Sequence, residues 1–362
     1  MAAITSSNYR NPAIDKIQSG YNPSGYSPAL PPYIDSVSGS VTQGSTMTIA
    51  AVNASSETSA TLQFTDFESL TVGQKIVGNV AWLDGNSDVG DYAYTASNDR
   101  PLTGSRVAKT HAVQTNIGLL QYPTGGVDEL FVEFYARTVT PDFTSSPDAP
   151  QIKFTRLASD IEAHGTPPYL GITIQGSATE ATLVHDYDGT PLVGYVQNYT
   201  PDAWERHTLF MRLSDPATMN GMRFYRTSFG NNWAFGGNNV FATPNEWGEP
   251  ESVTRGSGAT ATRQLEQMFF PFFQRDQQES MIDINHIYIH SNLERVYMST
   301  SPTPTASTSF KHVVCPTVSR SLTSIQFKSM IDVFEPEDDV YLYIVNANNR
   351  INTSGYLVRA GA

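Results

Sequence analysis

The chain contains a single cysteine, Cys315, among its 362 residues. One cysteine cannot form an internal disulfide, and it cannot supply the paired thiolates of a zinc ribbon or a dithiol redox motif. Cys315 lies in the apolar stretch HVVCPTV, which is typical of a strand. We therefore expect a buried thiol that packs as a small apolar side chain.

Long apolar runs are also missing. No run of about 18 apolar residues occurs, so the sequence predicts no membrane-spanning helix. The first residues, MAAITSSNYRNPAIDK, lack the basic and apolar segments of a secretory signal. We therefore interpret the glycosylation sequons at Asn53, Asn198 and Asn352 as chance matches. The expected protein is made in the cytoplasm without a signal peptide.

Positive charge is scarce, because 22 Lys and Arg residues face 35 Asp and Glu residues, which gives a net charge of −13. This balance argues against nucleic acid or an anionic membrane as the main partner. Charged residues make up only 16% of the chain, whereas Gly, Pro and aromatic residues are plentiful. Helices favour Ala, Leu, Glu and Lys, so the composition indicates an all-β protein with many turns.

Short strand-like runs separated by turn residues recur along the chain. The clearest is DELFVEFYARTV, residues 128–139, in which two sets of side chains alternate. QIKFTRLAS, YLGITIQG and WERHTLFMRL continue the series. Strands at this spacing predict a sandwich or a jelly roll.

The first 33 residues differ from the rest. They combine Asn-Pro, Ser-Gly and Pro-Pro breakers with spaced tyrosines, Tyr9, Tyr21, Tyr26 and Tyr33. Such a segment builds neither a helix nor a continuous sheet edge. One interpretation is a disordered tail. The other is an extended docking arm that binds a neighbouring subunit, because disordered tails are usually poor in aromatic residues. The second interpretation predicts a homo-oligomer or a larger assembly.

The remaining chain divides into four segments. A short β segment at 34–62 precedes the jelly roll at 63–298, and STSPTPTASTS at 299–309 is a linker. A small β module at 310–362 ends in a hairpin-like Asn-rich tip. Roughly 50 residues are too few to be very stable alone. We expect this module to pack against the 34–62 strands or the main sandwich.

Three stretches carry a resemblance to a known fold family. They are TDFESLTVGQKI (65–76), WERHTLFMRLSDPATMNGMRFYR (204–226) and DINHIYIHSNLERVYMS (283–299). In this order they resemble the concanavalin A-like lectin/glucanase jelly roll. The resemblance implies an all-β fold, an antiparallel two-sheet jelly-roll sandwich. The last stretch departs from the family pattern, since His286 and His290 stand where relatives often have aspartates. A shared fold does not by itself establish an activity.

The flanks resemble modules that accompany such jelly rolls. PYIDSVSGSVTQGSTMTI (32–49) is similar to the opening of immunoglobulin-like modules. DVYLYIVNANNRINTSGYLV (339–358) is similar to small β modules that follow jelly rolls in bacterial and bacteriophage proteins. The resemblance implies a fold with small β modules on both sides.

Catalytic signatures of this fold are not found. Glucanases carry a carboxylate cluster on one strand, and the nearest match, EPEDD at 335–339, is broken by proline. Alginate-type lyases need a Gln-Ile-His strand, and QIKFTR (151–156) has Lys153 in place of the histidine. Glu133 and the run Glu205–Arg206–His207 are interpreted as a solvated strand face or a cross-strand ion pair. The sequence therefore predicts a protein that is not an enzyme.

No cofactor is predicted, although one segment invites a test for calcium. WLDGNSDVGDY places Asp84, Asn86 and Asp88 at the alternating spacing of a calcium loop. The glycine that such a loop requires is replaced by Val89, and Thr95 stands at its last position. Polar turn chemistry explains the segment as well, so it is a weak candidate for calcium and no metal site is assigned.

The long Gly/Asn loop at 230–262 has the ingredients of a sugar-binding surface. Aromatic faces stack on pyranose rings, and Asn amides bond hydroxyl groups. The candidate glycan-binding residues are Trp233, Phe235, Asn238, Asn239 and Trp247. The alternative is that these aromatic side chains are buried under the loop or in a subunit contact.

Two histidines stand four residues apart in NHIYIHSNLERVYM. The surrounding Ile and Tyr residues favour a strand, in which four residues span roughly 13 Å. Zinc–nitrogen bonds are about 2.1 Å long, so His286 and His290 cannot share one ion. We expect both to line one face of a closing strand.

Three functions compete. The favoured one is a structural protein of a virus particle, a bacteriophage capsid-decorating, fibre or tail component located on the particle surface. Its arm would bind other virion proteins, and its jelly roll would bind host-surface glycan. The alternatives are a secreted or surface carbohydrate-binding module and a polysaccharide lyase or hydrolase of the same fold.

Overall fold

The computed structural model describes residues 30–54, 62–81, 84–85, 95–99, 101–112, 120–139, 151–158, 169–175, 180–186, 192–197, 202–213, 222–227, 264–270, 273–275, 280–304, 311–347 and 350–362. These segments contain antiparallel sheets and no α-helix, apart from a short 3-10 turn, η5, at Ile331–Val333. No helix in them is long and apolar enough to cross a membrane. The predicted all-β jelly-roll class is confirmed.

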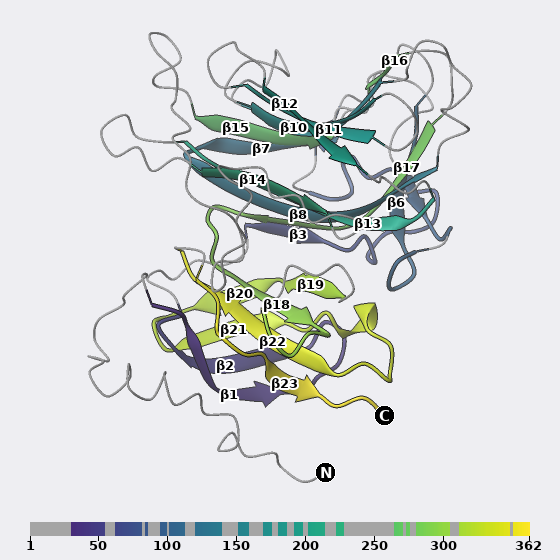
Figure 1. Ribbon diagram of the computed structural model, residues 1–362. Coiled ribbons are helices and arrows are strands. Elements are labelled where there is room, and N and C mark those ends of the chain that lie inside the picture. Colours follow the sequence, from purple (N-terminus) through teal and green to yellow (C-terminus); the bar gives the residue numbers. More distant parts are fainter. Residues whose placement is uncertain are drawn as a thin grey trace.

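Two sheets form the jelly roll (Figure 1). We call them the distal sheet and the central sheet, because the central sheet lies between the distal sheet and the rest of the protein. The distal sheet has the order β12 (Leu192–Gln197), β11 (Glu180–Asp186), β10 (Tyr169–Gln175), β9 (Gln151–Ala158), β15 (Leu265–Phe270), β7 (Leu120–Val127), β4 (Asp84–Gly85), and β16 (Phe273–Arg275) also pairs with β9.

The central sheet is built around the longest strands. Its order is β14 (Met222–Thr227), β13 (Trp204–Arg212), β8 (Glu129–Val139), β17 (Ser280–His290), β6 (Val107–Ala112), β5 (Thr95–Ser97), with β3 (Gln63–Thr65) paired to β17. Strands β8 and β17 bury apolar side chains on one face, including Val132, Phe134 and Ile287. Their other face also lies in the interior, because a second sandwich covers it.

This second sandwich consists of two four-stranded sheets (Figure 1). One has the order β1 (Tyr33–Gly39), β2 (Thr46–Val52), β21 (Ser324–Lys328), β20 (Thr317–Arg320). The other has the order β19 (His312–Cys315), β18 (Arg295–Ser299), β22 (Val340–Val345), β23 (Tyr356–Arg359). The first and last described strands therefore build one unit, and the jelly roll is inserted between β2 and β18.

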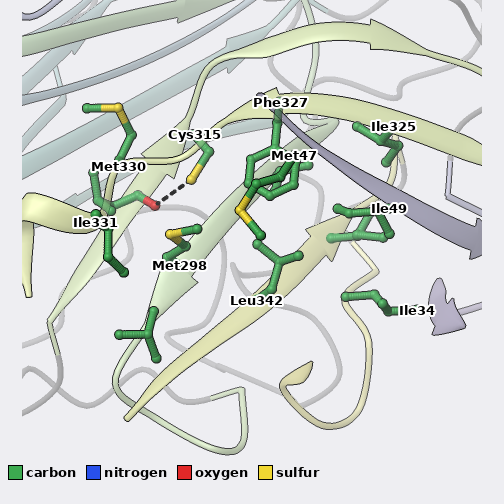
Figure 2. Packing of buried hydrophobic residues seen from close by; sticks show 14 of the residues in the cluster. Ile34, Met47, Ile49, Met298, Cys315, Ile325, Phe327, Met330, Ile331 and Leu342 are labelled. Atoms are coloured by element: carbon green, nitrogen blue, oxygen red, sulfur yellow. Dashed lines mark hydrogen bonds between the residues drawn. The ribbon is translucent and has the colours of Figure 1, made fainter. Parts of the chain in front are cut away.

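The core of the sandwich joins residues that lie far apart in the sequence (Figure 2). Ile34 and Ile49 from the first strands pack with Met298, Cys315 and Phe327 from the last ones. Cys315 is fully buried and unoxidised, as the sequence suggested. Burial raises the pKa of its thiol.

This pairing differs from the segment boundaries drawn from the sequence. Strand β18 was placed in the jelly roll, but it pairs with β19 and β22 of the sandwich. Strand β2 pairs with β21, so the 34–62 and 310–362 segments share a sheet instead of forming separate modules. Tyr33, placed in the docking arm, is the first residue of β1 and pairs with Val52. Local strand patterns do not specify which distant strand will be a neighbour.

Candidate functional site

The central sheet presents an unusual set of polar side chains to the sandwich. Along β8, Phe131, Glu133, Tyr135 and Arg137 occupy alternate positions, and all four are at most 7% exposed. Polar groups buried this deeply need partners, because an unpaired one costs free energy. The partners come from both the jelly roll and the sandwich.

Glu133 lies at the centre of this face. Its carboxylate accepts a hydrogen bond from the Thr208 hydroxyl at 3.1 Å and one from the backbone N–H of Val314 at 3.2 Å. The Arg206 guanidinium lies 3.9 Å away. The cross-strand ion pair expected for Glu133 is therefore present, but the solvated strand face is not. The carboxylate is enclosed between two packed units, where no polymer could reach it.

Arg137 forms a second buried group. Its guanidinium pairs with the buried Asp283 and, at 3.0 Å, with the half-exposed Asp202. It also lies 5.7 Å from the ring centre of Trp204, in a cation–π contact. Burial raises the pKa of Asp283, and the charge of Arg137 opposes that rise. This group has the character of a structural ion pair.

Three histidines of the central sheet are held inside the protein. His286 lies at a β-bulge with φ of 50°, and its Nε2 is 2.7 Å from the Thr103 hydroxyl. His290 accepts a hydrogen bond from the backbone N–H of Asn292 at 3.2 Å. His207 stacks on Phe134. Burial lowers the pKa of His286 and His207 to about 3, and the nearby Arg206 contributes for His207. Both are therefore neutral at physiological pH and unsuited to acid–base work there.

His286 and His290 contact the aromatic side chains that cover this face. His286 lies edge-on to Tyr135, and His290 stacks against Tyr288. They have separate hydrogen-bond partners. The described segments contain no group of three or more His, Cys, Asp or Glu residues placed to hold a metal ion.

The distal sheet offers the other large face. On β9, Thr155 and Leu157 are buried, which identifies the inner face of that strand. The alternation of a pleated strand assigns position 156 to the outer face. The register of β9 against β10 shifts by one residue, because Ile172 pairs with Thr155 and Thr173 pairs with Lys153. Positions 151 and 153 are therefore on the outer face as well.

Strand pairing extends this outer face into three rows of positions across the sheet. The rows are Arg275, Gln151 and Gln175; Phe273, Lys153, Thr173, Thr182 and Tyr195; and Phe269, Arg156, Gly171, Val184 and Val193. Three basic positions, 153, 156 and 275, thus lie on the neighbouring strands β9 and β16. Acidic positions also lie on this face. Positions 180 and 186 are on β11, two strands from β9, and position 84 is on β4, in the same row as position 156.

The residues that the sequence proposed are distributed differently. Trp233, Phe235, Asn238, Asn239 and Trp247 lie outside the described residues, as do Tyr9, Tyr21 and Tyr26. Asn86 and Asp88 also lie outside them, while Asp84 is in β4 and pairs with Gln121. The sequence predicted QIKFTR as a strand and as a broken lyase motif, and assigned no ligand to it. It missed Arg275, which the fold brings opposite Gln151.

The known proteins that resemble the chain do so at low sequence identity. No protein-family model matches the chain, and no curated protein sequence matches it. A glucuronan lyase from the fungus Trichoderma reesei is 11% identical, with a TM-score of 0.39 over 61% of this chain and 94% of its own. An alginate lyase from Aplysia kurodai is 9% identical, with a TM-score of 0.41 over 64% of this chain and 99% of its own. A cellulose-induced protein is 12% identical, with a TM-score of 0.42 over 64% of this chain and 97% of its own.

These comparisons correct one expectation and leave another without support. Several solved structures that resemble the chain are polysaccharide lyases. The prediction that the chain is not an enzyme is wrong, because missing motifs do not exclude an activity. The comparisons lend no support to a role in a virus particle. At these identities the likeness concerns the fold alone.

Proposed function

We propose that the outer face of the distal sheet binds a polysaccharide that carries carboxylate groups. The observation behind the proposal is the strand register, which gathers Lys153, Arg156 and Arg275 on two adjoining strands. The chain as a whole is acidic, with a net charge of −13. A local group of cations on an acidic protein favours an anionic ligand at that place.

The neighbouring positions suit a sugar chain. Gln151, Thr173 and Tyr195 belong to residue types that exchange hydrogen bonds with hydroxyl groups. Arginine binds a carboxylate through two parallel hydrogen bonds, which would select uronic acid units over neutral sugars. Neighbouring strands lie about 4.8 Å apart and alternate residues about 6.8 Å apart, so the three basic positions can act on one short stretch of polymer.

The decisive test is binding of defined polymers by the full chain. Calorimetry would compare alginate, glucuronan and polygalacturonate with a neutral glucan at two salt concentrations. We expect binding of at least one polyuronate, weakened by salt because exposed charges are screened. The variants Lys153→Ala, Arg156→Ala and Arg275→Ala should each weaken binding by several-fold or more, in the range of one charge-assisted hydrogen bond. Lys75→Ala, which changes an exposed lysine of the 62–81 segment, is the matched control.

The same samples distinguish a binding module from a lyase. A lyase would convert the polymer to unsaturated uronic acid ends, which absorb ultraviolet light and are followed directly. Equal binding of the neutral glucan would show that carboxylates are not what the face recognises. Binding that survives all three substitutions would place the ligand elsewhere.

A further inference from the structure

Among the described segments, strand β19 is an edge strand of the sandwich and pairs with β18 alone. In an antiparallel pair, alternate residues direct their backbone groups toward the neighbouring strand. The backbone carbonyl of Lys311, just before β19, accepts a hydrogen bond from the backbone N–H of Thr300, just after β18. The alternation therefore leaves the backbone groups of His312 and Val314 directed away from β18, where a further strand would normally bind.

Side chains of the jelly roll take the place of that strand. Glu133 accepts the backbone N–H of Val314 at 3.2 Å, and the Tyr135 hydroxyl donates to the backbone carbonyl of His312. Glu133 and Tyr135 are two residues apart on β8, and their partners are two residues apart on β19. The two strands therefore meet with matched spacing. We call these two hydrogen bonds the β8–β19 contact.

The surroundings make this contact hard to replace with water. Glu133 is 3% exposed, Tyr135 is 7% exposed and Val314 is 2% exposed. A buried N–H or C=O group that loses its partner carries the full cost of its desolvation. Stacked rings adjoin the contact, with the ring centres of Tyr297 and His312 3.9 Å apart.

We infer that the jelly roll completes the open edge of the sandwich, so that β19 depends on β8 and the two units unfold as one. The jelly roll inserted between β2 and β18, from β3 to β17, is then stabilising for the small sandwich. The contact joins the central sheet to the sandwich, on the side that faces away from the distal sheet (Figure 1). Loss of the contact would expose two edge groups of β19 to pairing with another chain.

Hydrogen exchange on the full chain at increasing urea concentrations tests the inference. Peptides from β8 and β17 report on the jelly roll, and peptides from β2 and β21 report on the sandwich. In the wild type we expect both sets to lose protection at the same urea concentration. In Tyr135→Phe, which removes a single oxygen, the peptide over 311–316 should exchange about tenfold faster, as one lost hydrogen bond allows.

Two further variants separate the contact from general destabilisation. Tyr343→Phe removes a comparable bond, from the Tyr343 hydroxyl to the Ser301 carbonyl at 2.6 Å, which lies wholly within the sandwich. It should leave the two units coupled. Glu133→Ala combined with Tyr135→Phe should let the sandwich peptides lose protection at lower urea than the jelly-roll peptides. Separate transitions in the wild type, or unchanged exchange over 311–316 in Tyr135→Phe, would overturn the inference.

Discussion

Arg137 on β8 and Asp283 on β17 form an ion pair in the interior of the central sheet, and their side chains are only 2% and 0% exposed. The two strands pair directly, with Asp283 opposite Arg137. Asp202 and Trp204, at the start of β13, contact the same guanidinium. Arg137 of β8 therefore contacts both neighbouring strands, β17 and β13.

Removing one member of this pair should be costly. Asp283→Ala leaves a buried guanidinium without its main partner, and we expect a loss of about 3 kcal/mol or more in the free energy of unfolding. The double change Arg137→Met with Asp283→Leu should cost less, because no uncompensated charge remains. Urea unfolding followed by circular dichroism measures both. Glu335→Ala, which breaks an exposed pair with Lys311, is the control and should cost at most about 1 kcal/mol. Equal losses for the single and double variants would contradict the argument.

The buried histidines predict a loss of stability in acid. Burial lowers the pKa of His286 to about 3, whereas an unfolded histidine has a pKa near 6.5. Between these values the unfolded chain binds a proton that the folded chain does not, so stability falls as the pH drops below about 6.5. Each such histidine contributes a slope of about 1.4 kcal/mol per pH unit.

His286→Asn isolates one of these contributions. Asparagine tolerates the positive φ of this position, and its amide can bond the Thr103 hydroxyl. Urea unfolding at pH 7 and pH 5 should show a smaller acid loss in His286→Asn than in the wild type. His207 remains in both proteins, so its contribution to the acid loss is the same in each. The same pH dependence in both proteins would mean that His286 is not neutral in the folded state.

The sequence predicted elements better than it predicted neighbours. The alternation in residues 128–139 identified β8, and the mixture of Ile and Tyr after Asp283 identified β17. Both are long strands whose period of two is visible without the fold. For Glu133 the sequence left open a solvated strand face or a cross-strand ion pair. The ion pair with Arg206 is present, and the solvated face is not, because a second sandwich covers it.

The candidate site shows the same limit. QIKFTR placed Lys153 and Arg156 on a strand, but which face each occupies depends on a register shift that only the pairing with β10 reveals. Arg275 lies more than 100 residues away and reaches Gln151 through the pairing of β16 with β9. Contacts of this kind are set by tertiary packing, which a single sequence does not record.

Cys315 provides a sensitive report on the sandwich. Its side chain is fully buried, and burial raises the pKa of the thiol, so little thiolate forms at pH 8. A thiol reagent should therefore react on the order of a hundredfold more slowly with the native protein than with the urea-unfolded chain, since labelling requires local opening. Absorbance of the released reagent product measures the rate. Rapid native labelling would show that the core around Cys315 opens readily.

Substitution of two glycines near the β1–β2 turn distinguishes the cost of backbone strain from the cost of close packing. Gly39 has φ of +109°, and a Cβ there would lie 2.8 Å from the Thr46 carbonyl oxygen and 3.0 Å from the Met47 Cα. Gly44 has φ of +70°, and a Cβ added there would have no neighbouring atom within 4 Å. Gly44→Ala should therefore cost only the left-handed backbone penalty of about 1–2 kcal/mol.

Gly39→Ala should cost more than Gly44→Ala, because β1 would have to move away from β2 in addition. That shift disturbs Ile34 and Met47, which belong to the core shared by both ends of the chain. Urea unfolding of the two variants, monitored by exchange in the β21 peptide, gives the comparison. If Gly44→Ala proved as costly as Gly39→Ala, the backbone conformation and not the close approach of β2 would be the dominant constraint on this turn.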